Sequence, residues 1–371
     1  MTQLFLSSLM LSHFRSHQKT RLQLDGRPVA IHGLNGAGKT NILEAVSLFS
    51  PGRGMRRAAA ADMVRRPEAL GWKLAGELHS QHMVHEIETW SQDGAARQVK
   101  IDGKAASQVA LGRIARVLWL VPSMDRLWIE GADGRRRFLD RVALSFEPSH
   151  AEVSLAYEKS MRERNRLLKD QVADDHWYRA LERQMAEAAE AIIRNRAEAV
   201  RKLLAAQENA ETAFPSASLE ITHAEGELPE TALDLTGCWS ETRRRDLAAG
   251  RTLVGPHRAD LNAVYRDKQV PARDCSTGEQ KALLVSLILA NARGLASEIA
   301  MPPLLLLDEV AAHLDVNRRA ALYDEICALG AQAWMTGTGA ELFEALGERA
   351  QYLEVQESAG ISQCGPIGGI G

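Results

Sequence analysis

The chain has 371 residues and a net charge of −3, and it is 45% hydrophobic and 25% charged. This length suits about two domains of ordinary size, and the composition is that of a globular protein. No apolar run reaches the roughly 20 residues that a membrane-spanning helix needs, so we expect no membrane partner. The slightly acidic balance excludes a uniformly basic surface. A nucleic-acid partner would therefore have to meet a local basic patch.

The N-terminal segment 1–11 alternates apolar and polar residues as a strand does. It lacks the basic start and the small-residue cleavage site of a signal peptide. The cysteines are scattered without metal-ligand spacing, so we expect them to be reduced; they are Cys238, Cys275, Cys327 and Cys364. These features together predict a cytoplasmic protein.

Short strands joined by turns are predicted over residues 1–31, and they lead into a phosphate-binding loop. Residues 33–40 fit the pattern G-x-x-x-x-G-K-[ST] at every fixed position, between an apolar strand and a segment with helical spacing. In such a loop backbone N–H groups turn inward around phosphate oxygens, and the helix N-terminus adds its positive dipole end. A glycine turn that binds nothing is the alternative, and the flanking elements disfavour it. The predicted nucleotide contacts are Asn35, Gly36, Ala37, Gly38, Lys39, Thr40 and Asn41.

Lys39 should reach the β- and γ-phosphates, and the hydroxyl of Thr40 should bind Mg²⁺. Arg15 lies in the turn between the first two predicted strands. It is either a solvated loop charge or a contact to the nucleotide base, and the sequence leaves both open.

A basic segment with glycines follows the loop and its helix. Arginine side chains and exposed backbone suit contacts to DNA phosphates, but a solvated loop has the same composition. Both interpretations stay open. The candidate DNA contacts are Arg53, Arg56, Arg57 and Arg65.

The pattern next predicts a β-meander over residues 71–121, which ends in the apolar strand 117–121 before Pro122. A helix-rich, charge-rich region follows, with one helix over 157–169 and a second over 177–210 that would be about 50 Å long. Most arginines of these helices are interpreted as solvated. Short strands return from about residue 250, and the Gly-rich tail from Ser358 onward is expected to be frayed.

Residues 303–307 form a buried strand that ends in Asp308 and Glu309. Ligands of open α/β sheets bind at the carboxyl ends of strands. Asp308 should hold Mg²⁺, usually through water, and Glu309 could act as the general base on the attacking water. The predicted catalytic residues are thus Lys39, Asp308 and Glu309. A strand that simply ends in solvated acids is the alternative, which the phosphate-binding loop on the same chain disfavours.

Ser276, Gly278 and Gln280 stand before a helical run over 282–293. A hydroxyl and a glycine at a helix N-terminus can hold a phosphate. An ordinary capping box, with Ser276 as the N-cap and Glu279 three residues later, explains the same residues.

The order of these parts resembles the ABC-type ATPases, whose Ser-x-Gly-Glu/Gln-Gln signature is similar to residues 276–280. The loop 311–319 resembles the segment that contacts the partner protomer in that group. The resemblance implies an ATP-dependent head-to-head homodimer, in which Ser276, Gly278 and Gln280 complete the partner's nucleotide site. Residues 336–338 carry no switch histidine.

Further motifs are similar to the RecF family of bacterial recombination mediators. They are Phe14–Ser16, Gly33–Asn41, Gly134–Asp140, Arg164–Lys169, Gly255–Leu261 and Thr336–Thr338. The resemblance implies a slow, DNA-stimulated ATPase that binds gapped or junction DNA and helps RecO and RecR to load recombinase, with hydrolysis as a timer. Met124 departs from the family pattern, which has a Glu-Asp pair after Pro122, and Gly337 interrupts a threonine run.

We therefore expect an α/β fold, an ABC-type P-loop ATPase head with a helix-rich second lobe inserted between its two halves. The expected boundaries are 1–122 and 250–371 for the head and 123–249 for the lobe. A transporter subunit is disfavoured by the missing switch histidine. A small-molecule kinase would need no signature motif, and the insertion is too short for the coiled-coil arm of an SMC protein.

Overall fold

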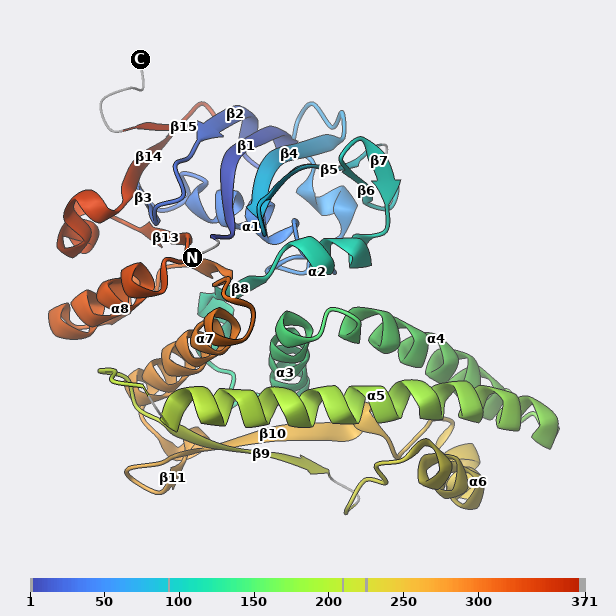
Figure 1. Ribbon diagram of the computed structural model, residues 1–371. Helices are drawn as coiled ribbons and strands as arrows, with labels where there is room; N and C mark the ends of the chain where they lie inside the picture. The colour runs from blue at the N-terminus through green and yellow to red at the C-terminus, as the bar shows by residue number, and fades with distance from the viewer. Residues whose placement is uncertain (1–2, 93, 209, 224–225, 367–371) are drawn as a thin grey trace. The chain divides into compact units, whose positions relative to one another are not determined.

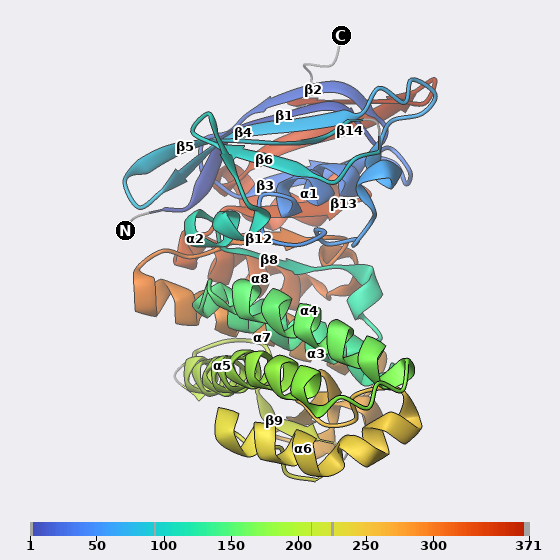
Figure 2. The same cartoon turned by 90° about the vertical axis from the view of Figure 1, so that its right-hand side faces the viewer.

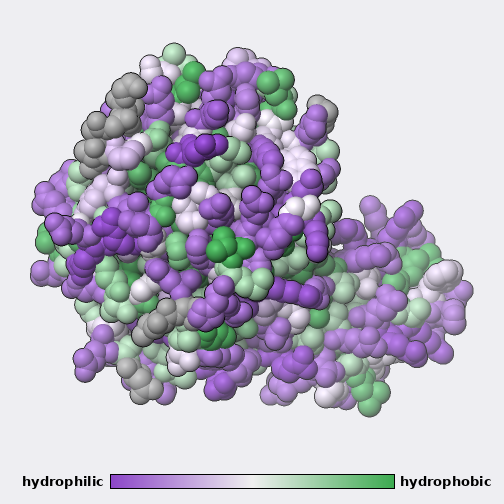
Figure 3. Space-filling view, turned by 45° about the horizontal axis from the view of Figure 1, so that its top comes forward, coloured by the Kyte–Doolittle hydropathy of each residue, from purple (hydrophilic) through white to green (hydrophobic). Residues whose placement is uncertain are grey.

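The computed structural model describes residues 3–92, 94–208, 210–223 and 226–366. The chain forms two compact units. We call the unit of Met1–Asp125, Ala206–Pro215 and Ser276–Gly371 the head, and the unit of Arg126–Ala205 and Ser216–Cys275 the lobe. The face of the protein seen in Figure 3 is largely hydrophilic, with hydrophobic residues only in small groups.

One sheet of the head is antiparallel, and its strands between residues 72 and 106 form a meander, as the alternating pattern predicts. Its strand order is β2-β1-β4-β5-β6-β7 (Figure 1). Alternate residues of β4 are buried, and β1 buries Leu6, Leu9, Leu11 and Phe14, which directs one apolar face of the sheet to the core. The strands are β1 (Phe5–Phe14), β2 (His17–Gln23), β4 (Trp72–Ser80), β5 (Met83–Ser91), β6 (Gln98–Ile101) and β7 (Lys104–Ala106).

The second sheet of the head is mostly parallel, with the order β15-β14-β3-β13-β12-β8. The neighbours from β14 to β8 pair in parallel, and only β15 runs antiparallel, beside β14. The carboxyl ends of the parallel strands therefore share one edge. The strands are β3 (Val29–His32), β8 (Val117–Leu120), β12 (Leu304–Leu307), β13 (Ala333–Gly337), β14 (Gln351–Ser358) and β15 (Ile361–Pro366). The apolar strand expected at the end of the meander, over 117–121, instead belongs to this second sheet, where residues 117–120 pair in parallel with residues 304–307.

Helix α1 (Lys39–Ser47) lies between the two sheets (Figure 2). Its buried side chains Ile42, Leu43 and Val46 belong to one core cluster together with side chains of both sheets. The phosphate-binding loop, which precedes α1, is thereby fixed against a rigid core. The short helix α2 (Leu111–Ile114) leads into β8.

Helices α7 (Thr277–Ile299) and α8 (Val316–Leu329) complete the head. In contrast to the expectation from the lengths of the apolar runs, the helix α7 is long and apolar enough to cross a membrane by length and composition. However, 67% of its apolar window is buried inside the protein. Core helices of globular proteins show this pattern too, so the composition of α7 is weak evidence for a membrane.

The expectation of a frayed tail is wrong for residues 361–366. They form β15, which pairs antiparallel with β14 from Ser358↔Ile361 to Leu353↔Pro366. Pairing with a strand of the sheet satisfies backbone groups that a Gly-rich segment would otherwise leave to water. Residues 367–371 lie outside the described residues.

The lobe contains helices α3 (Ala132–Phe146), α4 (His150–Lys169), most of α5 (Asp175–Glu208) and α6 (Ala232–Ala249). A three-stranded antiparallel sheet accompanies them, in the order β11-β10-β9. Its strands are β9 (Ala217–His223), β10 (Ala259–Tyr265) and β11 (Val270–Pro271). At 34 residues, α5 is the long helix that the periodicity predicts.

The observed division differs from the expected boundaries. Residues 250–275 belong to the lobe, because β10 pairs with β9 along its whole length, from Ala259↔His223 to Tyr265↔Ala217. The sequence pattern does not predict the strand β9. Residues 206–215 belong to the head.

Arg164, in the C-terminal half of α4, is completely buried, so the prediction of a solvated helical face is wrong at this position. Its guanidinium donates to Glu182 Oε1 at 2.9 Å and to Asp246 Oδ2 at 2.7 Å, and both acids are at most 1% exposed. It also donates to the hydroxyl of Thr252 at 2.8 Å. This network joins α4, α5 and α6 without leaving the cation unpaired.

Motif residues that carry the family resemblance form polar contacts inside the lobe, with one another or with residues outside the motifs. Arg135 donates to Asp260 at 2.6 Å, and Arg196 donates to Asp140 at 2.7 Å. The hydroxyl of Tyr157 lies 2.7 Å from His257 Nδ1. Burial lowers the pKa of His257 to about 4, so the ring is neutral at pH 7 and can accept this hydrogen bond.

We predict that Arg164→Ala lowers the free energy of unfolding by about 3 to 5 kcal/mol, because the buried carboxylates of Glu182 and Asp246 both lose their ion pair with Arg164, although Arg243 still pairs with Glu182. Urea unfolding of the full chain, followed by circular dichroism, measures this change. The matched control is Arg166→Ala on the same helix, whose side chain is 85% exposed and which should cost less than about 0.5 kcal/mol. Equal effects of the two substitutions would contradict the proposed importance of the buried network.

Candidate nucleotide-binding site

The phosphate-binding loop connects β3 to α1 and owes its shape to its glycines. Gly36 and Gly38 have φ of 83° and 105°, in the region that L side chains rarely adopt. Gly38 is also the N-cap of α1, and no side chain caps this helix end. The positive end of the helix dipole is thus open to an anion.

Lys39 lies in the first turn of α1 and is only 4% exposed. Its ammonium donates to the carbonyls of Gly33 at 2.7 Å and Leu34 at 2.9 Å, so it folds back across the loop. Burial lowers the pKa of Lys39, while the carboxylates of Glu309 and Asp308 act in the opposite direction. A phosphate placed in the loop would offer this ammonium a charged partner.

Thr40 and Asp308 meet as the sequence predicts. Asp308 follows the fully buried strand β12 and is 5% exposed. Its Oδ1 accepts from the Thr40 hydroxyl at 2.9 Å and from the Thr336 hydroxyl at 2.7 Å. The Thr336 hydroxyl in turn accepts from the backbone nitrogen of Glu309 at 2.9 Å. One threonine of β13 therefore holds the carboxylate of Asp308 and the backbone nitrogen of Glu309.

Mg²⁺ prefers oxygen ligands such as hydroxyl and carboxylate groups. The Thr40 hydroxyl and the Asp308 carboxylate lie next to each other and could both be ligands. Among the described residues, no group of three or more His, Cys, Asp or Glu could hold a metal ion. Mg²⁺ usually keeps several waters and binds through one or two carboxylates plus substrate phosphates. The donor pair fits that kind of site, with phosphate oxygens as the remaining ligands.

A pocket of about 420 Å³ opens beside the first turn of α1. Arg15 contributes to it, but its guanidinium is already engaged, forming a bidentate ion pair with the buried Glu44 at 2.6 and 2.9 Å. It also donates to the carbonyl of Asp62 at 2.8 Å. A contact between Arg15 and a nucleotide base stays a prediction. The pocket is lined by Arg15, Ser16, Asn41, Asp62, Val64, Arg65, Arg66 and Gly360.

The four candidate DNA contacts differ in exposure. Arg53 and Arg57 are exposed, and the side chain of Arg56 is 43% exposed although it donates to Asn41 Oδ1 at 3.0 Å. Arg65 is only 5% exposed, and its guanidinium donates to the carbonyls of Ser16 and Gly360. We therefore assign Arg65 a structural role and leave it out of the surface that could meet DNA.

The signature segment forms the capping box of α7. The Ser276 hydroxyl accepts a hydrogen bond from the backbone nitrogen of Glu279, and the Glu279 carboxylate accepts one from the backbone nitrogen of Ser276. Ser276 and Gly278 remain exposed, so capping leaves them accessible to a ligand. Gln280, in contrast, is 1% exposed and lies within the head, where it cannot reach a partner's nucleotide unless α7 rearranges.

Lys281 follows the signature and forms an ion pair with Asp125 at 3.2 Å. Asp125 is the acid that remains in the loop after Pro122, where Met124 replaces an expected Glu. The loop after β8 is thus tied to the start of α7 despite this departure.

Sequence reasoning missed several residues that shape the loop. His17 is completely buried, and its Nε2 lies 3.1 Å from the Gly38 carbonyl oxygen. Ser362 of β15 reaches the Ala37 carbonyl oxygen at 2.5 Å. In the sequence, Thr336 stands out as the place of a missing histidine and as part of a family motif, but neither pattern indicates its contacts with Asp308 and Glu309. No spacing pattern links these positions to the loop, because their contacts depend on the tertiary fold.

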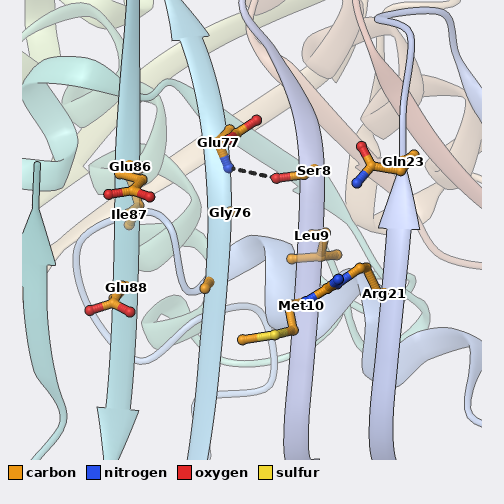
Figure 4. A pocket seen from close by; sticks show the side chains of 11 residues that line it. Ser8, Leu9, Met10, Arg21, Gln23, Gly76, Glu77, Glu86, Ile87 and Glu88 are labelled. Atoms are coloured by element: carbon orange, nitrogen blue, oxygen red, sulfur yellow. Dashed lines mark hydrogen bonds between the residues drawn. The ribbon is translucent and has the colours of Figure 1, made fainter.

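A second pocket, of about 220 Å³, lies on the antiparallel sheet (Figure 4). Three carboxylates, Glu77, Glu86 and Glu88, line it together with Arg21, and Ser8 bonds the backbone of Glu77 there. This acidic lining would repel phosphate groups. The chemistry that suits a nucleotide is therefore gathered at the loop before α1.

Comparisons with known proteins agree with this geometry. The family described as RecF/RecN/SMC N terminal domain matches residues 5–359. The chain is 49% identical to the DNA replication and repair protein RecF of Rhizobium rhizogenes over 362 residues, which are 95% of this chain and 96% of that protein.

Solved structures show the same fold. The recombination mediator protein RecF bound to ATP, from the RecFOR pathway, is similar with a TM-score of 0.82, at 23% identity over 98% of both chains. The Smc head domain of Pyrococcus furiosus is similar with a TM-score of 0.57, at 16% identity over 98% of this chain and 96% of that one. The predicted fold class, a P-loop ATPase head with a helix-rich lobe, is confirmed.

We predict that Thr336→Ala lowers the rate of magnesium-dependent ATP hydrolysis at least about tenfold, because Asp308 and the Glu309 backbone both lose a partner. A phosphate-release assay on the purified chain measures the rate. The matched control is Thr338→Ala, an exposed threonine two residues away, which should leave the rate unchanged. A Thr336→Ala variant with the wild-type rate would contradict this role.

Proposed function

Because the chain belongs to the RecF family, as its motifs predict, we propose that it is an ATP-dependent DNA-binding protein of recombinational repair and replication-fork maintenance. The observation that carries the proposal is the contact of Thr40 with Asp308, beside Lys39 in a glycine loop at a helix N-terminus. This arrangement offers an ammonium, a hydroxyl and a carboxylate to a magnesium-bound triphosphate.

The proposed ligands are ATP and Mg²⁺. Lys39 would bind the β- and γ-phosphates, and Thr40 and Asp308 would hold the metal, which supplies charge neutralisation on the phosphates. The backbone N–H of Glu309 is held by Thr336. Glu309 would orient or deprotonate the attacking water. In support, the RecF structure with the same fold is described as bound to ATP.

ATP is proposed to close a homodimer, in which exposed Ser276 and Gly278 of one protomer contact the nucleotide held by the other. Ser276 shares its hydroxyl between the Glu279 backbone and the Glu279 carboxylate. A γ-phosphate oxygen would replace the carboxylate as acceptor of the hydroxyl hydrogen. Gln280 would support this helix end from inside the head.

The proposed partners are gapped or junction DNA and, through it, the mediator proteins RecO and RecR. The protein would promote recombinase loading in the cytoplasm, and slow, DNA-stimulated hydrolysis would act as a timer on the closed clamp. The relationship to proteins named for DNA replication and repair supports this assignment. Arg53, Arg56 and Arg57 are the proposed contacts to DNA phosphates.

We predict that Lys39→Met abolishes ATP-driven dimerisation, because the loop loses the cation that binds the β- and γ-phosphates. Sedimentation velocity with gapped DNA, with and without a non-hydrolysable ATP analogue, measures the mass. The wild-type chain and the control Lys19→Met, an exposed lysine of β2, should become DNA-bound dimers with the analogue. A Lys39→Met chain that still dimerises, or a wild-type mass that ignores nucleotide, would refute the clamp.

We further predict that replacing Arg53 and Arg57 by Glu weakens DNA binding. The slope of log affinity against log salt should fall by about one for each phosphate that the variant no longer neutralises. Fluorescence anisotropy of labelled gapped DNA over a salt series measures both quantities. The control Lys104→Glu changes an exposed cation on β7 and should leave the slope unchanged. An unchanged slope in the double variant would exclude this segment as the DNA-binding surface.

A further inference from the structure

The C-terminal hairpin of β14 and β15 packs directly against the phosphate-binding loop. A Cβ at Gly33 would lie 2.1 Å from the Val355 carbonyl oxygen, and a Cβ at Gly38 would lie 2.3 Å from Ser362 Oγ. The glycines at the two ends of the loop are therefore required by close contact with this hairpin, in addition to their backbone angles.

Ser362 and Ser16 connect this hairpin to the loop through their hydroxyls. Ser362 Oγ lies 2.5 Å from the Ala37 carbonyl oxygen and 2.7 Å from Ser16 Oγ. Asn41 Nδ2 donates to Ser16 Oγ at 2.7 Å. The backbone nitrogen of Ser362 also donates to the Ser16 carbonyl at 2.9 Å, which fixes the two serines side by side.

The directions of these hydrogen bonds follow from the groups themselves. The Ala37 carbonyl can only accept, so the single hydroxyl hydrogen of Ser362 points to it. The Ser16 hydroxyl must then donate to Ser362 Oγ while it accepts from Asn41. Arg56 can only donate and faces Asn41 Oδ1 at 3.0 Å, which independently turns the amide nitrogen of Asn41 toward Ser16. All the donors therefore point one way along a relay from Asn41 to Ala37.

The relay fixes the orientation of the peptide that matters for phosphate binding. The carbonyl of Ala37 and the N–H of Gly38 belong to one trans peptide, so they point in opposite directions. Holding the carbonyl toward Ser362 aims the Gly38 N–H away from the hairpin. His17 Nε2 lies 3.1 Å from the Gly38 carbonyl oxygen. The Lys39 N–H belongs to the same trans peptide as this carbonyl, so it points away from His17.

We propose that Ser16 and Ser362 are positioning residues, whose relay from Asn41 to Ala37 holds the loop in its nucleotide-binding conformation. This inference rests on the proposed binding of ATP. It gives the last strand of the chain a role in the nucleotide site formed near its beginning. In this proposal each serine acts through the loop backbone, without contacting the nucleotide itself.

The test is the affinity of the full chain for a fluorescent ATP analogue with Mg²⁺, together with the melting temperature of the nucleotide-free protein. Ser362→Ala should weaken binding about tenfold, the usual effect of one lost hydrogen bond. Ser362→Thr keeps the hydroxyl and should bind within about twofold of wild type. Ser358→Ala, an exposed serine of the same hairpin, is the matched control and should also bind like wild type.

Ser16→Ala interrupts the same relay at a different residue. Combined with Ser362→Ala it should weaken binding hardly more than either change alone, because both break one chain of hydrogen bonds. Independent effects, about a hundredfold in the double variant, would overturn the relay. So would a Ser362→Ala chain that binds like wild type, or a Ser362→Thr chain that binds as weakly as Ser362→Ala at an equal melting temperature.

The wild-type result separates this inference from the proposed function. A folded wild-type chain that does not bind the analogue refutes the nucleotide site itself, and the relay with it. A wild-type chain that binds, with alanine variants that bind equally well, refutes only the relay.

Discussion

The head depends on one constraint, which is the burial of the Asp308 carboxylate directly after the completely buried strand β12. A buried carboxylate is costly unless hydrogen-bond donors satisfy it. The hydroxyls of Thr40 and Thr336 supply them. This requires α1, β13 and β12 to meet at one edge of the sheet. The parallel order of β3, β13 and β12 brings these residues together although up to 296 positions separate them along the chain.

The parts of this site that could be predicted are those whose residues are consecutive in the sequence. The loop at Gly33–Thr40 and the leucine strand before Asp308 each carry their chemistry in a few consecutive residues. The edge of the sheet where they meet follows from the rule that ligands bind at the carboxyl ends of strands. What could not be predicted is the support of the loop by His17 and Ser362, since it depends on which distant strands lie beside it.

The strands β9 and β15 were not predicted either, because they also depend on a partner strand elsewhere in the chain. β15 stands in a Gly-rich tail and lacks a clear alternation of apolar residues, and it is a strand through its pairing with β14. β9 pairs with β10, and this pairing moves residues 250–275 into the lobe. Local propensity is a weak guide at such edges, where the partner strand supplies the hydrogen bonds.

Arginine demonstrates how far composition can mislead about function. Arg164 stands in a charge-rich helical segment that looks solvated, yet two buried acids neutralise it. Arg135 and Arg196 are likewise held by carboxylates, those of Asp260 and Asp140. A guanidinium so engaged would give up one carboxylate to gain one phosphate, with little net benefit. The motifs of the lobe therefore identify the family through its architecture. The proposed contacts to DNA are better sought among the arginines that remain exposed beside the nucleotide loop.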